Sequence, residues 1–183
     1  FDANSSGIFN ISEVFKTSEV LKASKRLLIL TLLLCLKLTL SAQEAGQVIT
    51  KVYKQIDTVE LAMDLHYPAG EINKPLPIII FFFGGGWNGG KVSQFQPQAE
   101  YFAARGMITV LADYRVKSRH KTTPYEAVND AKSAIRYLRR HAKQLNINPK
   151  KIIASGGSAG GHLAAACGML PGLDEPGEEL SIS

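Results

Sequence analysis

The chain has 183 residues, a formal net charge of +5 and a pI of about 9.2, and 45% of its residues are hydrophobic. This composition excludes a collagen-like repeat, an acidic disordered tail and a disulfide scaffold, and the length suggests one domain. The basic residues are scattered in runs of at most two, which argues against a nucleic-acid partner.

An apolar segment lies near the N-terminus. Residues 27–40 are almost entirely apolar, basic residues precede them, and the small residues Ser41 and Ala42 follow. This arrangement is typical of a secretory signal peptide. The segment is short for a hydrocarbon layer of roughly 30 Å, and Lys37 interrupts it. An uncleaved membrane anchor and a buried helix are the alternatives.

The signal peptide predicts how the chain is organised. We expect an unassigned extension over residues 1–21, a signal peptide over residues 22–42, and a secreted or periplasmic domain over residues 43–183. The membrane would then be a partner only during export. Cleavage removes Cys35, so Cys167 would have no partner for an internal disulfide.

Two alternating apolar patterns predict an antiparallel strand pair over residues 48–67, joined by a turn at Asp57-Thr58. We expect the pair to have one buried face. The two sets of alternating residues are Val48, Thr50 and Val52, then Val59, Leu61, Met63, Leu65 and Tyr67. The apolar run over residues 78–83 is continuous, which predicts a strand covered on both faces, as in a mostly parallel sheet.

Helices and strands alternate in the rest of the chain. The expected elements are a helix over residues 95–103, a strand over 107–112, a helix over 125–141, a strand over 152–154 and a helix over 158–170. Gly106 suits the end of the first helix, and Pro124 suits the start of the second. This order predicts a three-layer α/β fold with right-handed crossovers.

The segment Gly156-Gly157-Ser158-Ala159-Gly160 matches the pattern G-x-S-x-G between a predicted strand and a predicted helix, the context this motif requires. A strained turn there lifts the serine hydroxyl off the sheet, and the glycines keep bulk away from the neighbouring backbone. The helix N-terminus offers unpaired N–H groups to a developing oxyanion. Ser158 is therefore a candidate nucleophile; an ordinary glycine-rich turn is the alternative.

A second glycine run, Gly84-Gly85-Gly86, follows the strand predicted over residues 78–83. Such a run lets backbone N–H groups turn toward a shared point, although a flexible turn has the same composition. A phosphate cradle is disfavoured because neither glycine segment has the G-K-[ST] ending of a P-loop. Both segments would lie at the carboxyl ends of strands, where α/β sheets bind ligands.

Four motifs occur in the order found in one enzyme family. They are Phe83 to Trp87, Asp113-Tyr114-Arg115, Pro124 through Asp130, and Gly156 through His162. Over residues 48–172 the chain resembles the N-terminal part of an α/β-hydrolase esterase of the carboxylesterase and hormone-sensitive-lipase-like type. It is similar to the small secreted acetyl and feruloyl esterases of polysaccharide-degrading bacteria. The fold implied is a three-layer α/β-hydrolase fold with a mostly parallel sheet.

The resemblance implies hydrolysis of carboxylic esters, with Ser158 forming an acyl-enzyme that water hydrolyses. It implies an oxyanion hole made by the backbone N–H groups of Gly85, Gly86 and Ala159, and Trp87 as a candidate lining residue of the substrate pocket. The substrate would be a small-molecule or polysaccharide-linked ester. No metal, no organic cofactor and no nucleic acid is implied. The family's usual histidine before the glycines is Phe83 here.

Other polar residues of these motifs are expected to be structural. In the family the Asp-Tyr-Arg motif supports the fold. Asp113 and Asp130 also precede Ser158, whereas the triad order of this fold is serine, acid, histidine. His162 lies on the same helix as the serine, and we expect it to pack rather than to act as the base.

The sequence after Ser158 supplies four acids, Asp174, Glu175, Glu178 and Glu179, and no histidine after His162. We therefore expect an N-terminal fragment with the C-terminal strands missing, inactive as given, whose full-length form is the esterase. Two alternatives stay open: a prolyl-oligopeptidase-type serine peptidase, and a non-catalytic ligand-binding α/β-hydrolase homologue. The glycine loop favours the esterase over the peptidase, and Phe83 is the feature that leans toward the non-catalytic protein.

Overall fold

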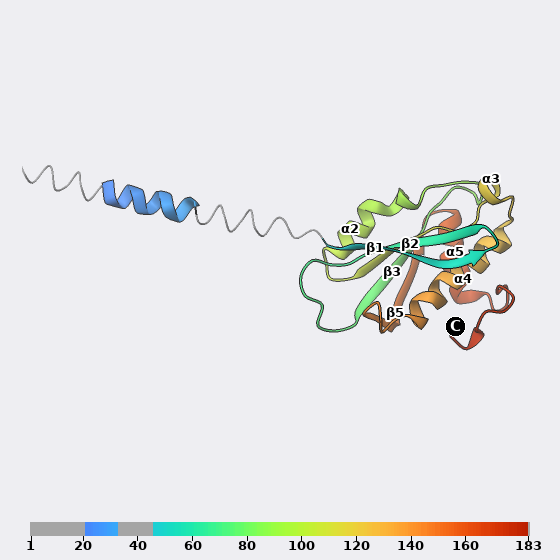
Figure 1. Ribbon diagram of the computed structural model, residues 1–183. Helices are drawn as coiled ribbons and strands as arrows, with labels where there is room; N and C mark the ends of the chain where they lie inside the picture. Colours follow the sequence, from blue (N-terminus) through green and yellow to red (C-terminus); the bar gives the residue numbers. More distant parts are fainter. Residues whose placement is uncertain (1–20, 33–45, 183) are drawn as a thin grey trace, which may run out of the picture. The chain divides into compact units, whose positions relative to one another are not determined.

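The computed structural model describes residues 21–32 and 46–182 (Figure 1). The chain divides into two units, Phe1–Glu44 and Ala45–Ser183. In the first unit, residues 21–32 form a helix with exposed side chains, which covers the start of the predicted apolar segment. The rest of the predicted signal peptide and most of the 1–21 extension lie outside the described residues. In the two described ranges, no helix has the length and apolar character needed to cross a membrane.

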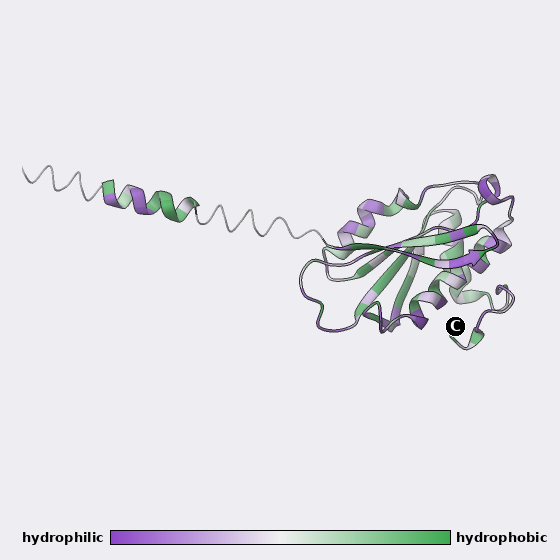
Figure 2. Ribbon diagram, in the orientation of Figure 1, coloured by the Kyte–Doolittle hydropathy of each residue, from purple (hydrophilic) through white to green (hydrophobic). Residues whose placement is uncertain are grey.

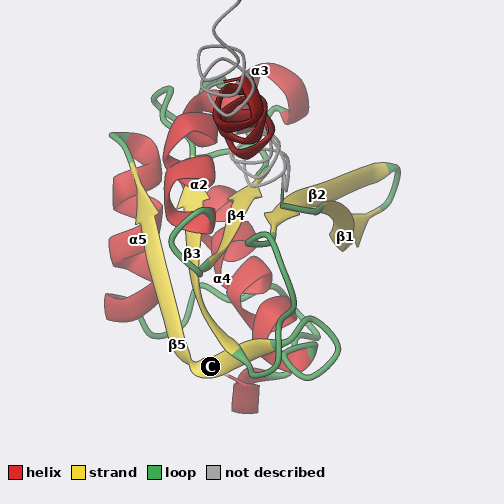
Figure 3. Cartoon of the chain, turned by 90° about the vertical axis from the view of Figure 1, so that its left-hand side faces the viewer, coloured by secondary structure: helices red, strands yellow, loops and turns green. Residues whose placement is uncertain are grey.

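The second unit is built on a five-stranded sheet with the order β1-β2-β4-β3-β5 (Figures 1 and 3). The strands are β1 (Val48–Ile56), β2 (Val59–His66), β3 (Leu76–Phe82), β4 (Ile108–Ala112) and β5 (Ile147–Gly156). β2 is antiparallel to both of its neighbours, whereas β4, β3 and β5 are parallel to one another. This is the predicted mostly parallel sheet, with the predicted hairpin at its edge.

The alternation of side chains along β3 serves two cores at once. Ile79 and Phe81 join Leu111 and Ala99 of α2 (Gln96–Ala103) on one face. Ile78, Ile80 and Phe82 point to the other face and join the larger core. Because successive side chains of a strand point to opposite faces, a strand covered on both sides reads as a continuous apolar run. Figure 2 shows this hydrophobic colouring along the central strands.

The larger core lies under two long helices, α4 (Pro124–Arg140) and α5 (Ala159–Met169), which complete the three predicted layers (Figure 1). α4 begins with Pro124 and with a capping box, in which Thr123 and Glu126 satisfy backbone N–H groups reciprocally. Its apolar stripe includes Ala127, Ala131 and Leu138, all fully buried. These features agree with the predicted helix, its start and its buried side.

The structure corrects the predicted buried face of β1. Val48 and Val52 are 53% and 47% exposed, whereas Tyr53 is buried. The pairing with β2 slips by one residue between Val52 and Lys54. Directly opposed residues of a strand pair share a face, so Ile49 and Lys51, which lie opposite the buried Leu65 and Met63, take the core side in place of Val48 and Val52. The bulge at Tyr53 then shifts the alternation, and Lys54, opposite Leu61, lies on the buried side after it. The predicted face of β2 is confirmed, with Leu61, Met63 and Leu65 almost fully buried.

Two other elements differ from the sequence-based expectation. β5 is longer than predicted and includes Pro149. Within the described residues β5 pairs only with β3, and an edge strand accepts a proline because one row of its N–H groups has no partner in the sheet. The short helix α3 (Lys117–His120) is not predicted, since four polar and charged residues give no apolar period.

Candidate active site

Ser158 lies at the turn between β5 and α5, and its backbone has a conformation that residues other than glycine rarely adopt. Its φ is 53° and its ψ is −119°, and it stands directly before the first residue of α5. A non-glycine residue held there costs of order 1–3 kcal/mol, and such strain is typical of functional sites. The residue is exposed. The predicted strand–turn–helix context of the G-x-S-x-G motif is therefore present.

Two glycines of the G-x-S-x-G motif stand where no larger residue would fit. A Cβ atom on Gly156 would lie 2.5 Å from the carbonyl oxygen of Phe82, and one on Gly160 would collide with the same oxygen. Phe82 is the last residue of β3. The elbow is thus pressed against the end of the neighbouring strand, and only glycine lets the two backbones approach this closely.

The second glycine run lies against the elbow. A Cβ atom on Gly84 would lie 2.8 Å from the carbonyl oxygen of Gly157 and 3.4 Å from the Cβ of Ser158. Gly85 and Gly86 follow with φ values of 143° and 62°. Two segments 70 residues apart in sequence therefore meet at the carboxyl ends of β3 and β5, where a parallel sheet places its ligand sites.

Three backbone N–H groups near the serine donate to none of the residues that the structure describes. No hydrogen bond to a described residue is recorded for the N–H groups of Gly85, Gly86 or Ala159. The N–H of Gly84, by contrast, donates to the side-chain oxygen of Gln94 at 2.5 Å. Unpaired donors at the first turn of a helix and in a glycine loop suit an anionic oxygen.

The buried side chain of Phe83 packs against the glycine loop and supports it. Its side chain is 1% exposed and stacks on Tyr114, with the ring centroids 4.1 Å apart. The Tyr114 hydroxyl donates to the Phe83 carbonyl oxygen at 2.7 Å. A Cβ atom on Gly90 would collide with the Phe83 ring, so the loop closes tightly over it. At the position of the family's usual histidine, stacking and a main-chain hydrogen bond position the loop.

The unpredicted helix α3 holds the far end of the same loop. The N–H groups of Lys117 and Ser118 donate to the carbonyl oxygens of Trp87 and Asn88, each at 2.9 Å. Backbone hydrogen bonds of this kind do not depend on side-chain type. The sequence pattern therefore predicts neither α3 nor its contact with the loop.

The structure brings Trp87 and His162 together. Their rings meet edge to face with centroids 5.3 Å apart. His162 is exposed and lies one turn into α5, and no hydrogen bond between its ring and the Ser158 hydroxyl is recorded in the described part of the chain. Its packing against Trp87 agrees with the expectation that it is not the base.

Arg115 and Asp130 form a buried ion pair. Arg115 donates to both carboxylate oxygens of Asp130 at 2.8 Å, and its backbone N–H donates at 3.0 Å. Lys54 and Glu175 complete the cluster, with Lys54 2.8 Å from Asp130 and 2.7 Å from Glu175. Burial disfavours the charged guanidinium, but the Asp130 carboxylate outweighs this and raises the pKa of Arg115. The cluster ties the hairpin, α4 and the C-terminal segment together, which is the structural role expected of Arg115.

Asp113 also has a structural contact. Its carboxylate accepts from the backbone N–H of Tyr114 at 2.8 Å and pairs with Arg119 at 2.6 Å. The four acids that follow Ser158 are directed at α4 or at the buried cluster. Asp174 pairs with Arg136 and Lys132, Glu175 with Lys54 and Arg115, Glu178 with Arg136, and Glu179 with Arg140. None of these acids shares a hydrogen bond with a histidine near the serine in the described residues.

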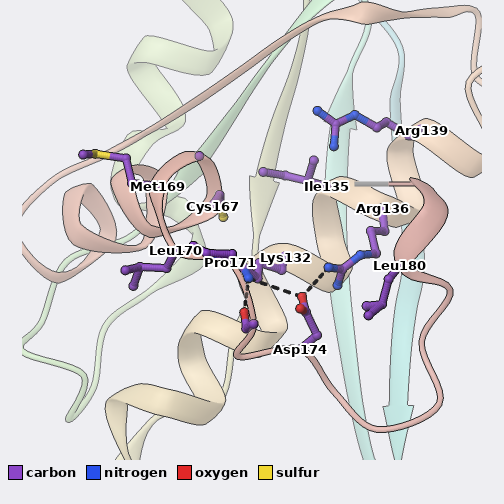
Figure 4. Close-up of a pocket in the computed structure, with 12 residues that line it drawn as sticks. Lys132, Ile135, Arg136, Arg139, Cys167, Met169, Leu170, Pro171, Asp174 and Leu180 are labelled. Atoms are coloured by element: carbon purple, nitrogen blue, oxygen red, sulfur yellow. Dashed lines mark hydrogen bonds and ion pairs between the residues drawn. The ribbon is translucent and has the colours of Figure 1, made fainter.

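A cavity of about 360 Å³ lies between α4, the end of α5 and the C-terminal segment (Figure 4). Lys132 and Arg136 converge on Asp174 in its wall, and Cys167 borders it. Burial raises the pKa of the Cys167 thiol to about 11, which keeps it protonated near neutral pH. α5 has 11 residues, so this cavity lies about 16 Å along the helix from the serine. It is separate from the elbow.

Among the described residues, no three His, Cys, Asp or Glu side chains cluster as metal ligands would.

The strand order, the elbow and the adjoining glycine loop define an α/β-hydrolase fold. The chain belongs to the BD-FAE family, whose model matches residues 63–180. The resemblance inferred from the four motifs is thus confirmed.

Solved structures of esterases are similar over most of the described fold. The apo form of Thermogutta terrifontis esterase 2 is 51% identical, with a TM-score of 0.72 over 76% of this chain and 52% of that chain. The same esterase has been solved phosphorylated by paraoxon, and its TM-score to this chain is 0.73. The chain therefore spans about half the length of these solved esterases.

Esterases are also found among the curated relatives. Carboxylesterase NlhH of Mycobacterium tuberculosis is 34% identical over 97 residues, which cover 52% of this chain and 30% of that protein. An esterase of Gibberella moniliformis is 35% identical over 96 residues, again 52% of this chain and 30% of the relative. The chain spans about a third of the length of these two proteins.

Proposed function

We propose that the protein hydrolyses carboxylic esters with Ser158 as the nucleophile. The observation that carries this is the strained Ser158 backbone, with φ 53° and ψ −119°, directly beside Gly84. In the proposed reaction the Ser158 oxygen attacks the ester carbonyl carbon and its proton passes to a histidine. The alcohol leaves with that proton, and water then hydrolyses the acyl-enzyme.

The carbonyl oxygen of the ester becomes an oxyanion in this attack. We propose the N–H groups of Gly85, Gly86 and Ala159 as its hydrogen-bond donors, because they have no partner among the described residues and lie on the two segments that meet at Ser158. Losing one such donor costs about 10²–10³-fold in kcat in well-studied acyl transfer. We expect the acid and the histidine of the triad from a part of the fold outside residues 48–172.

The substrate proposed is a small acyl ester, of the acetyl or feruloyl type, free or linked to a polysaccharide. Support comes from membership of the BD-FAE family and from esterases among the relatives. A solved Thermogutta terrifontis esterase 2 carries bound propionate, a short carboxylate. We further propose Trp87 as a wall of the substrate pocket, since it follows the donor glycines directly.

Steady-state kinetics of the full-length gene product tests this function. We expect turnover of p-nitrophenyl acetate and methyl ferulate, little turnover of aminoacyl p-nitroanilides, and loss of all turnover in Ser158→Ala. Faster cleavage of the anilides would identify a peptidase. Binding of esters without turnover would identify a non-catalytic homologue.

The proposed location is outside the cytoplasm, reached by cleavage of the 22–42 segment. N-terminal sequencing of exported protein should begin near Gln43. Recovery of an intact 27–40 segment in the membrane fraction would overturn this.

A further inference from the structure

A cavity of about 410 Å³ opens beside the glycine loop. Its lining residues are Gly86 and Trp87 of the loop, Lys117 and Lys121 of α3 and its end, Thr122, and Thr123 and Pro124 at the start of α4. Gly86 is one of the proposed oxyanion donors, and Gly84, two residues earlier, lies against Ser158. A group bound in this cavity would therefore adjoin an ester held at Ser158.

Two residues that line the cavity, Trp87 and Thr122, each carry a buried polar atom that pairs with no described residue. The indole Nε1 of Trp87 and the hydroxyl Oγ1 of Thr122 are buried, and neither has a hydrogen-bond partner within the described part of the chain. An indole N–H only donates, so it requires an oxygen acceptor. Buried donors in folded proteins are nearly always paired. Two unpaired donors on residues that line one cavity therefore indicate that a ligand with hydrogen-bond acceptors binds there.

The charge at the rim has the sign that suits an anion. Lys117 and Lys121 are exposed, and no ion pair with a described carboxylate is recorded for either. Between them Arg119 is already paired with Asp113 at 2.6 Å. The carboxylate at this end of α4, Glu126, is held by the Thr123 hydroxyl and backbone N–H, and the Thr123 hydroxyl lowers the pKa of Glu126. The two lysines are thus left to attract a ligand.

We propose that this cavity is a substrate subsite for a carboxylate carried by the ester. The Trp87 and Thr122 side chains turn on binding so that Nε1–H and Oγ1–H donate hydrogen bonds to the carboxylate oxygens, and the ammonium groups of Lys117 and Lys121 attract the carboxylate from the rim. The proposal rests on the proposed esterase function and names the substrate class: esters with a free carboxylate, on the acyl or on the alcohol side.

Binding is tested first, without catalysis. Trp87 is the only tryptophan among these 183 residues, and the part of the fluorescence change that Trp87→Phe removes from the full-length protein reports on this wall. In full-length protein we expect succinate to bind roughly fivefold more tightly than neutral succinamide, about what one partly screened charge contact gives. Lys117→Gln/Lys121→Gln should remove this preference. The matched control, Lys150→Gln/Lys151→Gln, loses the same charge at exposed positions elsewhere and should keep it.

Kinetics then separates the two sources of the carboxylate. On the acyl side, mono-p-nitrophenyl succinate is compared with p-nitrophenyl pentanoate; on the alcohol side, 4-acetoxybenzoate is compared with 4-acetoxybenzamide. We expect kcat/KM to favour the charged ester roughly fivefold in one of the two pairs, and Lys117→Gln/Lys121→Gln to abolish this while p-nitrophenyl acetate turnover is kept.

The outcomes distinguish the subsite from the proposed function. Equal binding of succinate and succinamide, or an equal loss in the Lys150/Lys151 control, overturns the subsite, as do flat ratios in both ester pairs. Absence of any ester turnover in the unmodified protein overturns the function instead, and the fluorescence titration still decides whether the cavity binds a carboxylate.

Discussion

The hydroxyl of Tyr114 donates a 2.7 Å hydrogen bond to the carbonyl oxygen of Phe83, and the two rings stack with centroids 4.1 Å apart. Tyr114 follows β4 and Phe83 follows β3, so this contact joins the ends of two neighbouring strands just before the glycine loop. Both side chains are fully buried. The pair fixes where the loop leaves the sheet, and hence where its N–H groups lie relative to Ser158.

Tyr114→Phe should destabilise the protein by about 1–2 kcal/mol. The stacked ring remains, but the Phe83 carbonyl loses its partner in a buried place. Urea unfolding measures the change, with Tyr101→Phe as the control because Tyr101 is 52% exposed. Equal stability of Tyr114→Phe and the unmodified protein would show that the loop is anchored in another way.

Replacing the nucleophile with glycine should stabilise the fold while ending the chemistry. Ser158→Gly relieves the cost of φ 53°, whereas Ser158→Ala retains it. After the entropy that glycine adds to the unfolded chain, we expect the glycine variant to exceed the alanine variant by about 1 kcal/mol. Thermal unfolding of both variants measures this. A less stable glycine variant would mean that the elbow is not strained.

Two glycines of α5 should respond to alanine in opposite ways. In Gly160→Ala the new Cβ collides with the Phe82 carbonyl oxygen, so a cost of about 1–3 kcal/mol and a displaced elbow are expected. In Gly168→Ala the new methyl meets nothing within 4 Å, and helix propensity predicts a gain of roughly 0.5–1 kcal/mol. Chemical denaturation of the two variants tests the pair. Similar effects at both sites would refute the close approach of α5 and β3.

Acid should weaken the contacts of the C-terminal segment. Burial works to raise the pKa of Asp174 and of Glu175, but hydrogen bonds from Arg136 and from Lys54 outweigh it, so both pKa values are lowered. A lowered folded-state pKa contributes stability that is present above the unfolded value and is lost as pH falls through the folded one. Stability should therefore fall below about pH 4.5.

A pair of double variants isolates this contribution. Asp174→Asn/Glu175→Gln should flatten the loss between neutral pH and about pH 3, because the groups that titrate are gone. The control Glu60→Gln/Glu71→Gln removes the same charge at exposed positions and should keep the slope. Identical slopes for both variants would show that the ion pairs with α4 do not stabilise the fold.

Local patterns were enough to predict much of this fold. The β3 run, the helix that Pro124 opens and the Ser158 elbow all follow from residues within one or two turns of one another. The Tyr53 bulge did not, because it depends on how β1 pairs with β2. The ion pairs that Lys54 makes with Asp130 and with Glu175 did not follow either. Lys54 and Glu175 are 121 residues apart in sequence, and no spacing rule joins them.

The candidate site also has features that follow from local motifs and features that depend on tertiary packing. The position of Ser158 and the meeting of the two glycine runs follow from motifs at the ends of parallel strands. The stacking of Phe83 on Tyr114 and the support from α3 arise from tertiary packing and backbone hydrogen bonds. The cavity beside Trp87 depends on the packing of the loop and on the position of α3, and no sequence pattern predicts it.

Covalent labelling of the full-length protein tests the central claim most directly. A fluorophosphonate probe requires an activated serine, so mass spectrometry of the labelled protein should find one adduct, on the peptide that carries Ser158. Hydrolysis of p-nitrophenyl acetate should fall in step with labelling, and Ser158→Ala should show neither adduct nor turnover. An adduct on another serine that accounts for the lost activity, or undiminished hydrolysis by Ser158→Ala, would contradict the account.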